Sequence, residues 1–95
     1  MESIMTDKKE CHVCGDQREL ERHHCLHGTS NRQKAEEDGL WVWLCPECHR
    51  GRWGVHGYDG YELNLSLKRE AEKVWMKYYG KTVDDWIARF GKNYL

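Results

Sequence analysis

Cysteine side chains form two closely spaced pairs in the first half of the chain. Cys11 and Cys14 make one Cys-x-x-Cys pair, and Cys45 and Cys48 make the other. Zinc in structural sites takes four thiolates in a tetrahedral arrangement, and each tight turn between paired cysteines spans one edge of that tetrahedron. The spacing therefore predicts one structural zinc ion held by all four residues.

Three histidines accompany these pairs: His23 and His24 are adjacent, and His49 directly follows the last cysteine. Metal-assisted hydrolysis needs a cation that stabilises negative charge in the transition state and a base that activates water. Imidazole can serve in either role near pH 7. Because side chains alternate along a strand, His23 and His24 are expected on opposite faces, where they can divide these tasks. An isolated histidine pair is more often one core and one surface residue, but the neighbouring cysteines favour chemistry here.

The length and composition set the class of protein. A chain of 95 residues allows one domain with a modest core, a size at which a bound metal often supplies stability. Five cysteines, with no signal peptide and no long apolar run, indicate a reducing compartment, so we expect a cytoplasmic protein without membrane contact. A net charge of −1 is unusual for a nucleic-acid binder. Residues 46–95 nevertheless carry nine Lys/Arg against seven Asp/Glu, so any basic surface is local.

Short elements must position the cysteines and histidines. Residues 20–27 have the length of a strand, and the apolar run 40–44 predicts a buried partner strand. Residues 29–39 between them are typical of a short polar helix, with Thr29 or Ser30 as the N-cap and a glycine at the end. Residues 1–9, which lack periodicity, are expected to form a mobile arm.

The second half predicts a helical turn, a loop and two helices. Pro46 can begin a helical turn, and residues 51–60 contain four glycines, which excludes a regular helix. The first long helix, which ends at Gly80, is expected to pack its apolar residues on the zinc unit; these are Leu63, Leu67, Ala71, Val74 and Tyr78. A second helix begins at Thr82 with Asp85 as its capping partner and ends at Gly91. It is expected to bury Val83, Trp86, Ile87 and Phe90.

These motifs carry a family resemblance. Cys-x-x-Cys-Gly, followed by Leu-Glu-Arg-His-His at residues 20–24 and Trp-Leu-Cys-Pro-Glu-Cys-His-Arg at residues 43–50, resembles the HNH endonucleases of the ββα-metal, or His-Me finger, class. The layout is similar to small HNH-type proteins of bacteriophages and prophages. The resemblance covers residues 11–56. It implies an α+β fold with a zinc-stabilised, treble-clef-like ββα-metal unit over residues 11–58. The two helices of residues 61–95 lie outside the resemblance and are expected, from their own sequence pattern, to pack on this unit, so that residues 1–95 form a single domain.

The resemblance also implies residue roles. In that class the first residue of the pair binds the catalytic metal, the second is the general base, and the histidine after the second cysteine pair is another ligand. Carried over, His23 and His49 hold the metal and His24 activates water. His56, in the glycine-rich loop, either completes the metal shell or is an ordinary loop residue. Histidine ligation favours Mn²⁺, Ni²⁺ or Zn²⁺ over Mg²⁺, and the sequence leaves the working ion open among these four.

The expected function is a metal-dependent DNA endonuclease or nickase, acting in the cytoplasm of a bacterial host if it is phage-encoded. Arg32, Arg50 and Arg52 either contact DNA phosphates or form a solvated charged surface. The asparagine usual in the class, about five positions before the second cysteine pair, falls at Leu40. The alternative is therefore a catalytically silent, zinc-stabilised module that binds nucleic acid or protein. The sequence does not indicate an oligomeric state.

The remaining notable residues have ordinary interpretations. Cys25 is expected to be a small buried residue, and His27 to lie on the surface or contact phosphate. Asn31 either supplies an amide to the site or caps the connecting helix. Trp53, alone among the tryptophans in a glycine-rich loop, is the candidate for stacking on a base.

Overall fold

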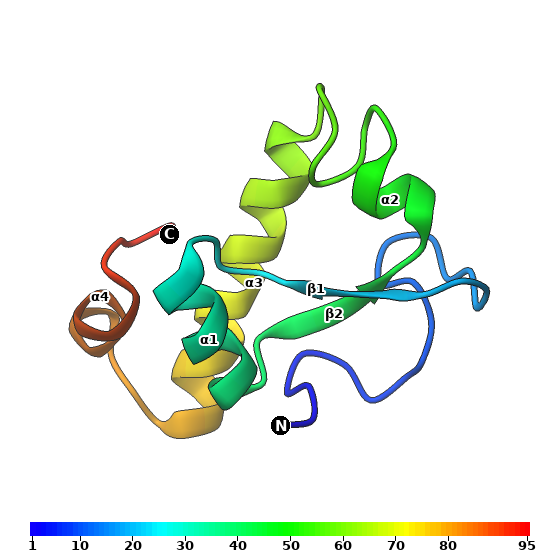
Figure 1. Ribbon diagram of the computed structural model, residues 1–95. Helices are drawn as coiled ribbons and strands as arrows, with labels where there is room; N and C mark the ends of the chain where they lie inside the picture. Colours follow the sequence, from blue (N-terminus) through cyan, green and yellow to red (C-terminus); the bar gives the residue numbers. More distant parts are fainter.

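The computed structural model describes all of residues 1–95 as a two-stranded antiparallel sheet with four helices around it (Figure 1). The elements in chain order are β1 (Glu21–His24), α1 (Thr29–Asp38), β2 (Trp41–Leu44), α2 (Pro46–Arg50), α3 (Tyr61–Tyr79) and α4 (Val83–Phe90). The expected α+β class and order of elements are confirmed. None of the helices, including α3, which is the longest, is both long enough and apolar enough to span a bilayer.

The two strands pair over their whole length. Glu21 lies opposite Leu44, and His24 lies opposite Trp41. The strand expected over residues 20–27 is shorter, because the chain leaves the ladder after His24. Cys25 still donates its backbone N–H to the Leu40 carbonyl at 3.0 Å, but its side chain is already fully buried in the core.

The connecting helix α1 begins at a glycine. Gly28 is the N-cap, with φ 89° and no side-chain cap, so the predicted capping by Thr29 or Ser30 is wrong. That positive φ is open to glycine at little cost, and the chain therefore turns one residue before the hydroxyl side chains. The end is as expected: Gly39 is left-handed at φ 79°. Of the helix residues only Ala35 is buried, which agrees with a polar connector.

The core lies where α3 and α4 pack together and against the sheet region. Helix α3 buries Leu67, Ala71 and Trp75, which follow one another at four-residue spacing on one face. Tyr78, which was predicted to lie on the same apolar face, points away from it and is 60% exposed. Glu72, a charged residue of the same helix, is fully buried.

The short helix α4 buries fewer of its apolar residues than the sequence predicted. Trp86 and Phe90 are buried at four-residue spacing, and their rings lie 4.3 Å apart between centroids. Val83 and Ile87, which were expected to be buried, are exposed at 36% and 39%. The predicted cap is confirmed, because Thr82 accepts from the Asp85 backbone N–H and donates its own N–H to the Asp85 carboxylate.

The C-terminal helices also hold α1 in place. Asp38, the last residue of α1, accepts hydrogen bonds from the indole of Trp75 at 2.9 Å and from the guanidinium of Arg89 at 2.6 and 2.8 Å. The Asn31 amide donates to the Phe90 carbonyl at 2.9 Å. Both ends of α1 are therefore fixed by α3 and α4.

The N-terminal segment packs against the end of β2. Ser3 donates its hydroxyl to the Trp41 carbonyl at 2.6 Å, and the Ile4 N–H donates to the Gly39 carbonyl at 2.9 Å. The prediction that residues 1–9 form a mobile arm is therefore wrong. The segment has no periodicity because single hydrogen bonds, and not a regular face, attach it to the fold.

Candidate metal centres and catalytic cleft

The four paired cysteines come together at one end of the sheet. Their sulfurs all lie within 4.8 Å of one another, and the Cys14 and Cys45 sulfurs are 3.7 Å apart. Zinc–sulfur bonds of about 2.3 Å in a tetrahedron place sulfurs ~3.8 Å apart. The four thiols can therefore hold a structural metal such as zinc. Cys25 is buried apart from them, beside the Met5 sulfur, as expected for a small core residue.

Backbone N–H groups donate to two of these thiols, those of Cys45 and Cys11. Cys45 is the N-cap of α2, and its sulfur accepts from the Cys48 N–H at 3.5 Å. Burial opposes ionisation of the Cys11 thiol, but hydrogen bonds from three backbone N–H groups outweigh it and lower its pKa to about 6. Because the thiolate is the form that binds zinc, a lowered pKa favours binding near neutral pH.

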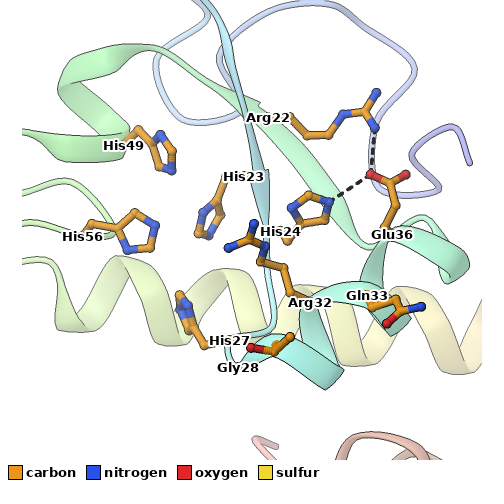
Figure 2. A pocket seen from close by; sticks show the side chains of 11 residues that line it. Arg22, His23, His24, His27, Gly28, Arg32, Gln33, Glu36, His49 and His56 are labelled. Carbon is orange, nitrogen blue, oxygen red and sulfur yellow. Dashed lines mark hydrogen bonds and ion pairs between the residues drawn. The ribbon is translucent and has the colours of Figure 1, made fainter.

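A second cluster contains three imidazoles from three different elements (Figure 2). His23 comes from β1, His49 from α2 and His56 from the following loop, with ring centroids 5.2, 5.2 and 4.9 Å apart. One nitrogen from each lies within 4.8 Å of the others. The structure thus brings together the two predicted ligands and His56, whose role the sequence had left open.

His23 lacks the hydrogen bond that a buried polar group normally has. Its side chain is 2% exposed, and Nε2 has no partner. Buried polar atoms are rarely left unpaired, so this nitrogen fits the role of a metal ligand. Burial, followed by the charges of neighbouring imidazoles, lowers the pKa of His23 to about 3. His23 is therefore neutral at ordinary pH, which is the form that binds a metal ion.

The loop after α2 is folded tightly enough to return His56 to His49. The His56 N–H donates to the His49 carbonyl, and the Val55 N–H donates to the Cys48 carbonyl, each at 3.0 Å. A Cβ atom on Gly54 would lie 2.7 Å from the Cys48 carbonyl oxygen. The glycine content of this loop thus permits the close approach that the sequence indicated.

The carboxylate of Glu21 forms a hydrogen bond with the ring of His49. The Glu21 Oε1 lies 2.7 Å from His49 Nδ1, and Arg50 donates to the same carboxylate at 2.6 and 3.1 Å. Hydrogen bonds from Arg50 and then His49 lower the pKa of Glu21 to about 2. An ionised carboxylate only accepts, so Nδ1 carries the proton and Nε2 is free to bind a metal. Sequence reasoning missed Glu21, although its position two residues before His23 places both on one face of β1.

His24 lies outside the three-histidine cluster but beside the same cleft. Its Nε2 is 3.0 Å from Oε1 of Glu36, on α1, and Arg22 donates to that same oxygen at 2.8 Å (Figure 2). His23 and His24 thus diverge, as expected for neighbours on a strand. Glu36 was not singled out from the sequence, because a glutamate in a polar helix carries no pattern of its own.

The cleft beside these histidines has a volume of about 840 Å³ and no hydrophobic side chain in its lining. Arg22 and Arg32 are exposed and line the cleft. His27 also lines the cleft, and its Nε2 lies 2.9 Å from Asn64 Oδ1. The other residues that line the cleft are His23, His24, Gly28, Thr29, Gln33, Glu36, His49 and His56. This surface suits a polar, anionic ligand.

Two of the three predicted phosphate contacts lie elsewhere. Arg50 is paired with Glu21, and Arg52 donates to Asp59 at 2.5 Å; neither lines the cleft. Of the predicted arginines, only Arg32 lines the cleft.

No amide reaches the cleft from the positions considered in the sequence. Leu40 is fully buried, and Asn31 is turned toward α4. Trp53 remains 67% exposed, in contrast to the buried Trp41, Trp75 and Trp86.

No protein-family model, curated protein or solved structure matches this chain. A function for it therefore has to be argued from the two clusters and the cleft between β1, α1 and α2.

Proposed function

We propose that the protein is a metal-dependent phosphodiester hydrolase of the HNH type that cuts or nicks DNA. The observation that carries the proposal is the unpartnered Nε2 of buried His23, which faces His49 and His56 beside a polar cleft. Three imidazole ligands with room for further ligands are typical of a catalytic rather than a structural metal site. The same cleft holds His24, a separate imidazole that does not belong to the cluster.

The arrangement of elements supports the resemblance to the ββα-metal class. The strands β1 and β2 lead into the short helix α2, and four cysteines tie the chain before β1 to the start of that helix. In this reading the treble-clef-like unit is zinc-stabilised, and α3 and α4 pack on it. The histidine that follows the second cysteine pair then belongs to α2, one residue from a zinc ligand.

In the proposed reaction His23, His49 and His56 would hold a divalent ion, which would stabilise the negative charge that develops on the phosphate. His24 accepts a proton from the attacking water. Arg32 offers its guanidinium group to a phosphate of the strand that enters the cleft, whereas Arg22, which also lines the cleft, is paired with Glu36. Glu21 holds His49 in the tautomer that leaves Nε2 unprotonated.

A catalytically silent binding module is the second candidate. Buried Leu40 occupies the position of the usual asparagine, and the two arginines outside the cleft are neutralised by carboxylates. Such a module would keep the four-cysteine site and lose hydrolysis. The two candidates differ in whether the three-histidine cluster supports turnover.

A plasmid-nicking assay with Mg²⁺, Mn²⁺, Ni²⁺ or Zn²⁺ tests the proposal. His24→Ala should lower cleavage about 10² to 10⁴-fold while DNA affinity stays nearly constant, because a proton acceptor is removed. His23→Ala should also abolish cleavage, but excess ion should partly restore it. His12→Ala is the matched control, because His12 pairs with Glu70 outside the cleft at 2.7 Å. A wild-type protein inactive on single-stranded, duplex and branched DNA with all four ions would favour the silent module.

A further inference from the structure

We infer that Glu36 is the positioning residue for His24, and that it makes Nδ1 the ring nitrogen that receives the proton from water. This inference deepens the proposed hydrolase and rests on it. It assigns a role to a side chain of α1, the connecting helix, which lies outside both clusters of cysteine and histidine residues.

The argument begins with the hydrogen bond between the two side chains. His24 Nε2 lies 3.0 Å from Glu36 Oε1. An ionised carboxylate has no proton to donate, so Nε2 must be the donor. A neutral imidazole carries one proton, and the other nitrogen is then an acceptor. Nδ1 is therefore left without a proton and available as a base.

The surroundings keep Glu36 ionised. Arg22 donates to Oε1 at 2.8 Å, and the Met1 amino group lies 3.1 Å from Oε2. Partial burial opposes the charged form, but hydrogen bonds from His24, the Met1 amino group and Arg22 outweigh it and lower the pKa of Glu36 to about 2. A carboxylate accommodates several donors at once, so Arg22 does not displace His24.

The helix that carries Glu36 is held from the opposite side. Ala35, the preceding residue, is fully buried, and Asp38 is bonded to both Trp75 and Arg89. These contacts fix the position of the helix backbone relative to β1. The carboxylate is thus a rigid partner, which is what a positioning residue requires.

Glutamine is the informative substitution at this position. Its amide has nearly the shape of the carboxylate but no charge, and its NH₂ group can donate to Nε2 and select the opposite tautomer. Glu37→Gln is the matched control, because Glu37 is the next residue on α1 and pairs with Arg89 instead of facing the cleft. Glu36→Gln should lower the turnover rate about 10²-fold or more with little change in KM, by analogy with other lost supports of a histidine.

NMR of ¹⁵N-labelled, zinc-loaded protein at about pH 8 gives a readout that needs no catalysis, since histidine is neutral there. Protonated and unprotonated ring nitrogens have well separated shifts, and loss of a signal in His24→Ala identifies the residue. We expect His24 protonated at Nε2 in the wild type and in Glu37→Gln, and a shift toward protonation at Nδ1 in Glu36→Gln. A wild-type His24 protonated at Nδ1, or an unchanged tautomer in Glu36→Gln, overturns the inference.

The two readouts separate this inference from the proposed function. A wild type that cuts DNA while Glu36→Gln cuts equally well removes the role of Glu36 and leaves the hydrolase standing. A wild type that never cuts DNA, with His24 protonated at Nε2, removes the hydrolase and with it the catalytic part of the inference, while the orientation of the ring by Glu36 is retained. If Glu36→Gln fails to fold, the wild-type tautomer alone still decides the structural claim.

Discussion

Replacement of Cys14 by serine should weaken the binding of the structural metal and destabilise the protein. Cys14 is the exposed member of the four-cysteine cluster, so its substitution leaves no cavity in the core. Serine keeps the size of the side chain but does not ionise near pH 7, and a neutral hydroxyl is a poor ligand for zinc. Any loss of stability can therefore be assigned to the metal.

The expected size of the effect follows from the small core. Only 20 of 95 residues are buried, so the fold relies on additional stabilisation. Zinc binding in small domains contributes about 10–16 kcal/mol, or roughly 2.5–4 kcal/mol for each of four thiolates. Loss of one thiolate should thus weaken zinc binding about 10² to 10³-fold. Because total stability is typically about 5–15 kcal/mol, the metal-free chain should be largely unfolded.

The assay combines zinc content by elemental analysis with thermal unfolding followed by tryptophan fluorescence. Cys25→Ala is the control: Cys25 is fully buried and outside the cluster, so this variant should lose about 1 kcal/mol and keep one zinc per chain. Cys14→Ser should hold zinc about 10² to 10³-fold more weakly, so that a chelator that leaves the wild type loaded removes its zinc and with it the cooperative transition. If Cys14→Ser retains zinc and melts like the wild type, or if metal-stripped wild type still melts cooperatively, the reasoning is refuted.

Two further predictions concern carboxylates, one in β1 and one at the start of α4. Glu21→Gln should weaken the binding of the activating ion about 10 to 100-fold, because the partner of His49 at 2.7 Å loses its negative charge. The metal titration of nicking should shift while the zinc content of the four-cysteine site stays unchanged. Hydrogen bonds from Thr82 lower the pKa of Asp85 below 3.8, so its stabilising effect is present above that value and is lost as pH falls through the lowered value. Asp85→Asn should therefore lose less stability than the wild type between about pH 5 and pH 2 in denaturant titrations, and equal losses would contradict the capping argument.

Features that depend on neighbouring residues could be predicted from the sequence. The two cysteine pairs, the helix ends at Gly39, Gly80 and Gly91, and the capping of α4 all follow from local geometry and were confirmed. The alternation of a strand likewise predicted that adjacent histidines diverge. In each case a residue's own conformational preference, or a spacing of a few positions, decides the outcome.

Features that depend on distant contacts could not be predicted. Glu36 meets His24 across 12 positions, and Arg89 meets Asp38 across 51. Neither pair leaves a periodic signal, because a charged residue in a polar helix is the ordinary case. Glu21 is different: alternation places it beside His23, and a search for supporting carboxylates on that face would have found it.

The attachment of α1 to the C-terminal helices limits how the histidine-bearing unit could be transplanted. A designer who grafted residues 11–58 onto another scaffold would carry over every cysteine and histidine of the two clusters. The graft would lack Arg89 and Trp75, and the helix that bears Glu36 would lose its anchor at Asp38. The portable unit is accordingly longer than the motif, and it has to reach at least the end of α4 at Phe90.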